Sequence, residues 1–374
     1  GRMYLEFSST AGNNILNPGH AAIGNVELEI GGQRIDRQYG HWMEAWAELT
    51  EPNDAAVVRD EGSAGVYDGT KFQNLAGAGG CVAGGSVDCI VPLHFWFCRN
   101  PGLALPLIAL QYHEVKIVLD HVISGIFDAG ITNKLWCDYI YLDTDERRRF
   151  AQVSHEYLIE QVQEQGLTAT TGAQDLNFNH PVKELIWVYQ DKNRCCPTVA
   201  DITKNAWFNF GWNDHNLVYP GYLTDSATAN VTGNNNLAAN PFILDCVNGA
   251  DMPLGTCGTP KDGRVHDFLS SSYTNKIQLN GHDRFAQRDR SYFTRTQVWE
   301  NHTGYGGVTK ADSIAVYSFA LKPEEHQPSG TCNFSRIDNA QLIQDGTAQE
   351  LRIYAVNYNV LRIMSGMGGL AYSN

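Results

Sequence analysis

The chain has 374 residues, 43% of them hydrophobic and 18% charged, which excludes a disordered chain and is enough for two packed domains. Its formal net charge of −14 argues against direct binding to nucleic acid, which needs a basic surface, and against docking on an anionic membrane. Its 36 glycines and frequent asparagines favour many turns, so the composition predicts an all-β protein.

The first elements in the chain are short strands and one helix. Residues 3–7 (MYLEF) read as a strand that starts almost at once, without a signal peptide or an initiating methionine, so we expect the natural N-terminus to lie upstream. Residues 26–30 and 33–37 are extended around Gly31 and Gly32, which predicts a β-hairpin. Four apolar residues then share one face of a short amphipathic helix: Trp42, Ala45, Trp46 and Leu49.

The most apolar stretch covers residues 90–120. Prolines cut it into pieces of strand length, and no window of about 18 residues lacks a proline or a charge, so it is not a transmembrane helix. We expect two buried strands, near 90–97 and 107–119, joined by a rigid Pro-Gly turn. The apolar side changes face within the second strand, which predicts a β-bulge at residues 113–114.

The remainder of the first half is predicted as loops and one strand. Residues 53–88 and 121–134 are polar or glycine-rich and read as loops. Residues 135–142 (LWCDYIYL) read as a buried strand, and 143–149 (DTDERRR) as a charged exit from it.

The order of elements then recurs. Residues 157–162 read as a strand, and four further segments echo the first half in the same order: 184–189 echoes 3–7, 276–285 echoes 27–35, 314–343 echoes the apolar stretch with its Pro-Gly break, and 351–364 echoes 135–149. The pattern predicts two fused copies of one β-sandwich, covering residues 1–152 and 153–374. A glycine- and asparagine-rich insertion at about 191–273 interrupts the second copy.

No motif predicts catalysis, a cofactor or a metal site. Residues 366–371 fit a dinucleotide-binding glycine pattern, but they end three residues from the C-terminus, so no helix can follow to receive a pyrophosphate. The acidic residues of 143–146 precede three arginines that would repel a cation. The nine cysteines are odd in number and show no CxxC spacing, so we expect reduced thiols; a loop disulfide within Cys81/Cys89 or Cys246/Cys257 is the alternative.

The candidate surface sites are aromatic residues and glycosylation sequons. Trp207 and Trp212 lie in the segment AWFNFGW, where core packing or subunit contact is favoured over a platform for sugars. Asn230, Asn301 and Asn333 each lie in an N-x-[ST] sequon, and without a secretory signal we expect no N-glycan from the host's lumenal route.

Several long motifs resemble one family. They are 30–36 (IGGQRID), 101–115 (PGLALPLIALQYHEV), 155–161 (HEYLIEQ), 327–340 (QPSGTCNFSRIDNA) and 357–374 (NYNVLRIMSGMGGLAYSN). Together they resemble the major capsid protein of nucleocytoplasmic large DNA viruses, closest to the algal-virus and giant-virus branch. The resemblance implies a double jelly-roll of two eight-stranded sandwiches, a homotrimer forming a pseudo-hexameric capsomer, and an icosahedral shell. Family members also carry an upstream arm and first strand, so we expect the first jelly roll to lack them here.

The resemblance also sets the expected partners and place of action. They are other copies of the chain, neighbouring capsomers, and minor capsid and penton proteins, with no direct contact to nucleic acid and no membrane insertion. The protein would belong to the virion and assemble in the host cytoplasm. The rival interpretations are a glycan-cleaving enzyme, which needs two facing carboxylates that the sequence does not offer, a carbohydrate-binding attachment module, and a minor capsid or penton protein.

Overall fold

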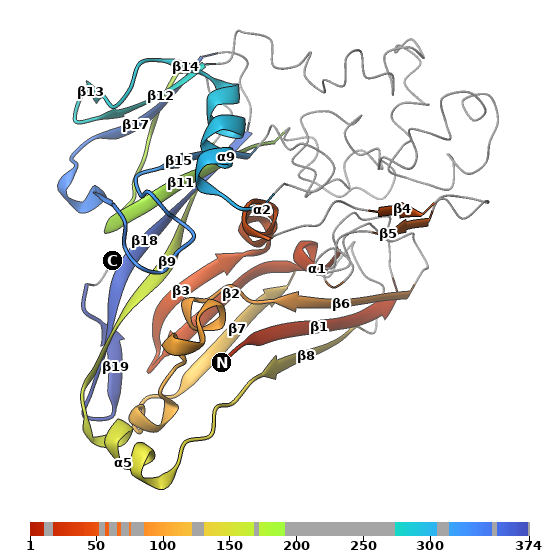
Figure 1. Ribbon diagram of the computed structural model, residues 1–374, viewed down its shortest axis with the longest axis vertical. Helices are drawn as coiled ribbons and strands as arrows, with labels where there is room; N and C mark the ends of the chain where they lie inside the picture. The colour runs from red at the N-terminus through yellow and green to blue at the C-terminus, as the bar shows by residue number, and fades with distance from the viewer. Residues whose placement is uncertain are drawn as a thin grey trace.

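The computed structural model describes residues 1–10, 18–51, 57–59, 66–68, 75, 86–121, 131–167, 172–190, 274–304, 314–345 and 350–372 (Figure 1). The predicted loops at 53–88, 121–134 and 191–273 lie wholly or largely outside these residues. Within the first of them, two short strands pair: β4 (Val57–Arg59) and β5 (Val66–Asp68). No helix among the described residues is long and apolar enough to cross a membrane.

The first half of the chain forms two three-stranded antiparallel sheets. In one, β1 lies between β6 and β8; in the other, β2 lies between β3 and β7. The strands are β1 (Met3–Thr10), β2 (Ile23–Ile30), β3 (Gln33–Tyr39), β6 (Ser86–Pro92), β7 (Val115–His121) and β8 (Thr132–Cys137). The helices and 3-10 turns are α1 (Pro18–Ala21), α2 (Gly40–Thr50), α4 (Trp96–Arg99), η1 (Pro101–Leu103) and η2 (Leu107–Ala109), followed by α5 (Thr144–Gln152).

The second half forms two larger sheets. In one, β11 lies between β15 and β18, with β9 and β19 also on β18 and β16 on β11; in the other, β12 lies between β13 and β17, with β10 on β17 and β14 on β12. The strands are β9 (His155–Leu167), β10 (Gly172–Asp175), β11 (Pro181–Gln190), β12 (Thr274–Leu279), β13 (His282–Asp283), β14 (Arg288–Asp289), β15 (Ile314–Ser318), β16 (Cys332–Asn333), β17 (Ala340–Asp345), β18 (Glu350–Met364) and β19 (Met367–Leu370). The helical turns are η7 (Tyr292–Thr296), α9 (Gln297–Asn301) and η8 (Phe334–Arg336).

The two halves repeat one pattern of strand pairing. The order β6-β1-β8 recurs as β15-β11-β18, and β3-β2-β7 recurs as β13-β12-β17, in the same order along the chain. A helical segment follows the hairpin in both halves, as α2 in the first and as η7 with α9 in the second. The pairing agrees with the repeat expected from sequence, including the correspondence of residues 3–7 with 184–189.

The hairpin β2–β3 shows why the sequence prediction holds here. Val26, Leu28 and Ile30 are fully buried on one face, as their alternation predicts. Gly31 and Gly32 have φ of +60° and +80°, the left-handed values that a two-residue hairpin turn requires at both positions. The predicted helix is also present, and α2 buries both of its tryptophans.

The predicted strand at 107–119 is wrong in its first part. The strand β7 begins only at Val115, and residues 107–109 form the turn η2. Residues 96–99 form the helix α4, so the strand predicted at 90–97 also ends early, at Pro92. The prolines remove backbone donors and the chain coils into helical turns. The change of apolar face marks the start of a strand, and not a bulge at 113–114.

The stretch 135–149 also differs from its prediction. The strand β8 ends at Cys137, and the charged residues form the helix α5 instead of an irregular exit. Asp145 and Glu146 lie in the first turn of α5 and Arg149 in the last, which is the order that stabilises a helix dipole. That signal was present in the sequence.

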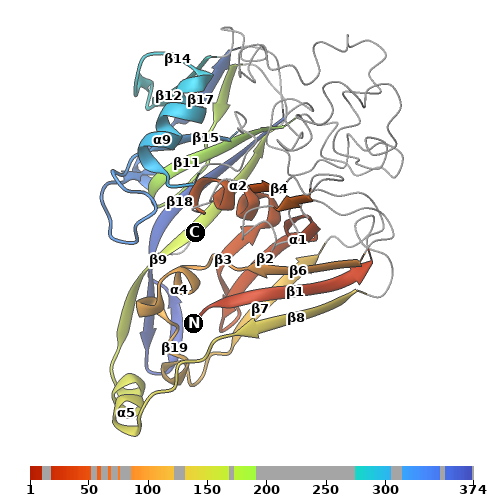
Figure 2. The ribbon, with the colours of Figure 1, turned by 45° about the vertical axis from the view of Figure 1, so that its right-hand side comes forward.

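One sheet of the second half is buried on both faces. In β11, Ile186 and Val188 pack into the core of the first half, whereas Leu185 and Trp187 pack into the core of the second half. Since side chains alternate along a strand, one apolar run serves both cores. The long strands β9 and β18 belong to this sheet and run the length of the molecule beside the first half (Figures 1 and 2). We call the junction between this sheet and the first half the seam.

Candidate functional site

The predicted surface residues fall in two groups. Trp207, Trp212 and Asn230 lie outside the described residues. Asn301 ends α9, and its side-chain nitrogen donates to the backbone carbonyl of Gln297 at 2.8 Å. In the third sequon, the Asn333 side chain accepts a hydrogen bond from the backbone nitrogen two residues further on, at 3.1 Å. Glycan attachment or surface contact at Trp207, Trp212, Asn230 and Asn301 stays a prediction.

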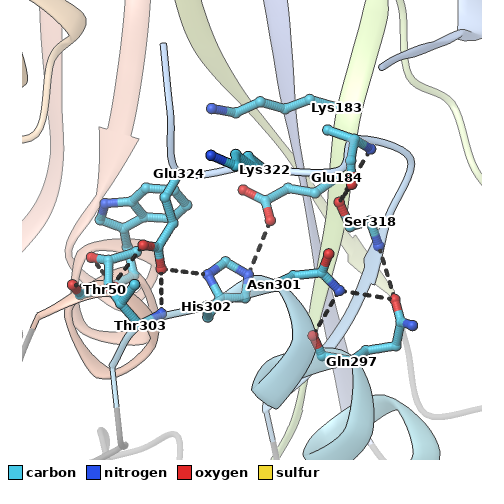
Figure 3. Close-up of polar contacts among 12 residues, drawn as sticks. Thr50, Lys183, Glu184, Gln297, Asn301, His302, Thr303, Ser318, Lys322 and Glu324 are labelled. Atoms are coloured by element: carbon cyan, nitrogen blue, oxygen red, sulfur yellow. Dashed lines mark hydrogen bonds and ion pairs between the residues drawn. The ribbon is translucent and has the colours of Figure 1, made fainter. Parts of the chain in front are cut away.

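A buried polar cluster lies directly after Asn301 (Figure 3). The His302 ring lies between two carboxylates, with Nε2 at 3.1 Å from Glu184 Oε2 and Nδ1 at 3.0 Å from Glu324 Oε1. The side chains of His302 and Glu184 are fully buried. A strand (β11), a helix end (α9) and the loop after β15 therefore bring three titratable groups together.

The charges in this cluster are fixed by their surroundings. Burial would lower the pKa of His302, but the charges of Glu184 and Glu324 and their hydrogen bonds raise it to about 9. Burial would raise the pKa of Glu324, but hydrogen bonds from His302 and Thr303 lower it. At neutral pH the cluster is a protonated imidazole held by carboxylates.

The same loop joins the second half to the helix α2 of the first half. Thr303 Oγ1 lies 2.8 Å from Glu324 Oε2 and 3.2 Å from the backbone oxygen of Thr50. The Gly304 nitrogen donates to the Leu49 oxygen at 2.8 Å, and a Cβ at Gly304 would lie 2.5 Å from the Leu49 carbonyl carbon. Only glycine allows the two backbones to come this close.

A second buried ionic group lies further along the seam. Glu160 of β9 forms ion pairs with Arg99 of the first half and with Lys183 of β11, the latter at 2.9 Å. Burial would raise the pKa of Glu160, but Arg99, His326 and Lys183 lower it. Burial lowers the pKa of Lys183, and the charge of Glu160 opposes this only in part. The Arg99 guanidinium also lies over the Trp46 ring, 5.2 Å from its centroid.

Hydrogen bonds at the edge of β3 extend the seam. The Asp36 carboxylate accepts from the backbone nitrogen of Val162 at 3.0 Å and from the Gln38 side chain at 3.1 Å. Burial raises the pKa of Asp36 to about 6, although these hydrogen bonds lower it. The Gln161 side chain donates to the backbone oxygen of Ile35. These contacts attach β3 of the first half to β9 of the second.

This geometry suits a structural joint and not catalysis. Both ring nitrogens of His302 are held by carboxylates and the ring is charged at pH 7, so it cannot serve as a general base. Among the described residues, no three or more His, Cys, Asp or Glu side chains gather in a way that could hold a metal ion.

Comparison with known proteins identifies the family of the chain. One family model, the large eukaryotic DNA virus major capsid protein, matches residues 146–369, and a second, the major capsid protein N-terminus, matches residues 6–143. The chain belongs to the major capsid protein family of large eukaryotic DNA viruses. Its fold is therefore the all-β double jelly-roll, its role is structural, and its place is the capsid of a virion.

The relatives cover nearly the whole chain. Major capsid proteins of Phaeocystis pouchetii virus and Pyramimonas orientalis virus are each 42% identical, over 96% and 100% of this chain and 82% and 83% of the relatives. Among solved structures, the VP54 protein of PBCV-1 matches with a TM-score of 0.70 and 36% identity, covering 100% of this chain and 89% of that one. The Faustovirus major capsid protein matches with a TM-score of 0.56 at 12% identity, over 96% of this chain and 77% of that one, and supports the fold alone.

Sequence reasoning missed the seam residues of the capsid chain. The signal was a lysine and a glutamate, Lys183 and Glu184, directly before the apolar run of the strand β11. Charged residues in a strand that is buried on both faces require partners. The partners lie elsewhere in the sequence, at Glu160 for Lys183 and at His302 for Glu184, so the sequence could not name them.

Proposed function

We propose that the chain assembles as a homotrimer, and that its two jelly rolls, residues 1–152 and 153–374, place six sandwiches in each pseudo-hexameric capsomer. The repeated strand pairing supports this, because two similar units on one chain turn threefold symmetry into an approximately sixfold outline. Eight strands per sandwich remain part of the proposal. Within the described residues β7 and β8 each pair with one strand, whereas the corresponding β17 and β18 also pair with β10 and β9.

The seam gives the proposed capsomer its rigidity. If the two halves moved independently, the six units of a trimer would not hold one outline. The ion pair of Glu160 with Arg99, the hydrogen bonds of residues 303 and 304 to α2, and the shared apolar sheet oppose such motion. Separating the halves would take Arg99 away from the buried carboxylate of Glu160.

In this proposal the capsomers tile an icosahedral shell and meet one another, minor capsid proteins and penton proteins, after assembly in the host cytoplasm. The loops at 53–88, 121–134 and 191–273 supply contacts and an outward-facing tower. Because the chain is acidic, we expect contacts between capsomers to depend on salt and pH.

The direct test of the trimer is the native mass of the purified chain. Three 41.4 kDa chains give about 124 kDa, and we expect this species over a wide range of protein concentration. A variant at an exposed side chain, such as Lys322→Ala, serves as the control and should have the same mass. A single-chain mass at micromolar concentration would refute the proposal.

A further inference from the structure

One end of the molecule presents a segment that buries nothing. None of residues 138–154 is buried, and α5, at the lower end in Figure 1, has no buried side chain. Before α5 lie three consecutive apolar or aromatic residues, Tyr139, Ile140 and Tyr141, which are 67%, 58% and 87% exposed. Such a run on the surface of a folded protein marks a contact site.

Two distant segments join this one. The turn η2 contacts α5 and exposes Leu107 and Ile108. The Tyr112 nitrogen donates to the Gly366 oxygen at 3.0 Å, which brings the β18–β19 turn and its exposed methionines beside the same end. We call these exposed side chains the end surface: Leu107, Ile108, Tyr112, Tyr139, Ile140, Tyr141, Met364 and Met367.

Four charged side chains of α5 form no ion pair within the part of the chain that the structure describes. Asp145 and Glu146 in its first turn, and Arg148 and Arg149 one turn later, are all exposed and form no ion pair with any described residue. A nine-residue helix that buries no side chain is marginally stable by itself. Because this helix is formed nevertheless, and because the side chains around it are exposed, we infer that another surface covers it.

The charge pattern selects the partner. Lipid and nucleic acid are unsuitable, because the carboxylates of residues 138–146 outnumber the three arginines that follow them. The partner must offer acidic groups to Arg148 and Arg149, basic groups to Asp145 and Glu146, and apolar side chains beside them. A second copy of this chain offers all three in one segment.

We propose that the end surface is a contact between copies of this chain, in which the acidic first turn of α5 in one copy faces the arginines of α5 in the next. This rests on the proposed self-assembly and adds the surface that carries it. The contact joins different patches on the two copies, so it can repeat around a closed ring.

The test uses two charge-reversed forms of the full chain. The acid-reversed variant carries Asp145→Arg and Glu146→Arg, and the arginine-reversed variant carries Arg148→Glu and Arg149→Glu. Each alone places like charges across the contact, so we expect association at least about tenfold weaker than wild type at 50 mM salt, and a smaller loss at 1 M salt, where the Debye length is about 3 Å. Native mass spectrometry and sedimentation measure the association.

Mixing the two variants provides the rescue. The basic α5 of one then meets the acidic α5 of the other, so mixed assemblies should form more strongly than either variant alone. A ring of three copies still holds one contact between like variants, so the gain should stay below wild-type strength. A control that exchanges the exposed pair Lys322 and Glu325 should associate as wild type. Tyr141→Ser should weaken association at both salt concentrations, because it removes apolar contact area.

Three results would overturn the proposal. The first is wild-type association of either reversed variant; the second is no gain on mixing. The third is that wild type binds phosphatidylcholine–phosphatidylserine vesicles and that Tyr141→Ser loses this binding while its self-association stays normal. That result would assign the end surface to lipid. A wild-type chain that stays monomeric would refute the proposed trimer. A wild-type trimer whose reversed variants associate normally would refute only the end-surface contact, so the two failures are distinguishable.

Discussion

The buried histidine of the seam allows the sharpest prediction. In His302→Gln, the carboxylate of Glu184 remains buried but loses its positive partner, and removing one member of a buried ion pair costs about 3–5 kcal/mol. The pKa of the histidine gives a similar size, because a rise from 6.5 to about 9 corresponds to about 3 kcal/mol. We expect the melting temperature at pH 7 to fall by roughly 5 °C.

The same residue predicts a pH dependence of known sign. The folded pKa of His302 lies above its unfolded value, so its stabilisation is complete below pH 6.5 and is lost as pH rises through about 9. The stability difference between wild type and His302→Gln should therefore be about 3 kcal/mol at pH 7 and close to zero at pH 10. Groups that do not contact His302 titrate equally in both proteins, and their contributions cancel in the difference.

The assay is calorimetric unfolding at pH 7 and pH 10 of wild type, His302→Gln and the double variant Glu184→Gln/His302→Gln. The double variant removes both charges and should recover much of the loss. Glu325→Gln, at an exposed ion pair, is the matched control and should change stability by less than about 0.5 kcal/mol. An equal difference between wild type and His302→Gln at both pH values would refute the reasoning.

Three further predictions concern the seam, the second core and the C-terminal hairpin. Glu160→Gln removes the counter-charge of a buried lysine and should cost about 3–5 kcal/mol in denaturant unfolding; a cost below 1 kcal/mol would contradict the ion pair. Trp187→Ala should cost about 3–5 kcal/mol, whereas Trp299→Ala, at an 81% exposed position, should be almost neutral in the unassembled chain; equal effects would disprove the assigned burial. Gly366→Ala should cost about 1–3 kcal/mol more than Gly281→Ala in thermal melts: both have left-handed φ, but only the first places a Cβ 2.5 Å from a tyrosine ring. Similar costs would argue against that contact.

The repeat could be predicted because its signals are local. Alternation in β2, a glycine pair with positive φ and the helical spacing of the α2 tryptophans each depend on a few adjacent residues. The same applies to β11 and β18, whose long apolar runs mark central strands. Four segments of the second half that match the first half in the same order were enough to indicate a duplicated sandwich.

The seam could not be predicted because its partners are distant. Glu184 meets a histidine that lies 118 positions later, and no spacing rule connects them. The error at 107–114 has a different cause, since apolar residues between prolines fit a strand and a series of helical turns equally well. The helix α5 was missed because the charge sequence was taken as a loop, although its order of acids before arginines favours a helix.

The central claim is that a duplicated jelly-roll, held rigid by the seam, builds a shell by its shape. Electron cryo-microscopy of the assembled protein tests it most directly. We expect rings of six β-sandwich densities formed by three chains, with the side chains of His302 and Glu160 buried between the two sandwiches of each chain. Rings in which each chain contributes one sandwich, or sandwiches from one chain separated by solvent at these residues, would contradict it.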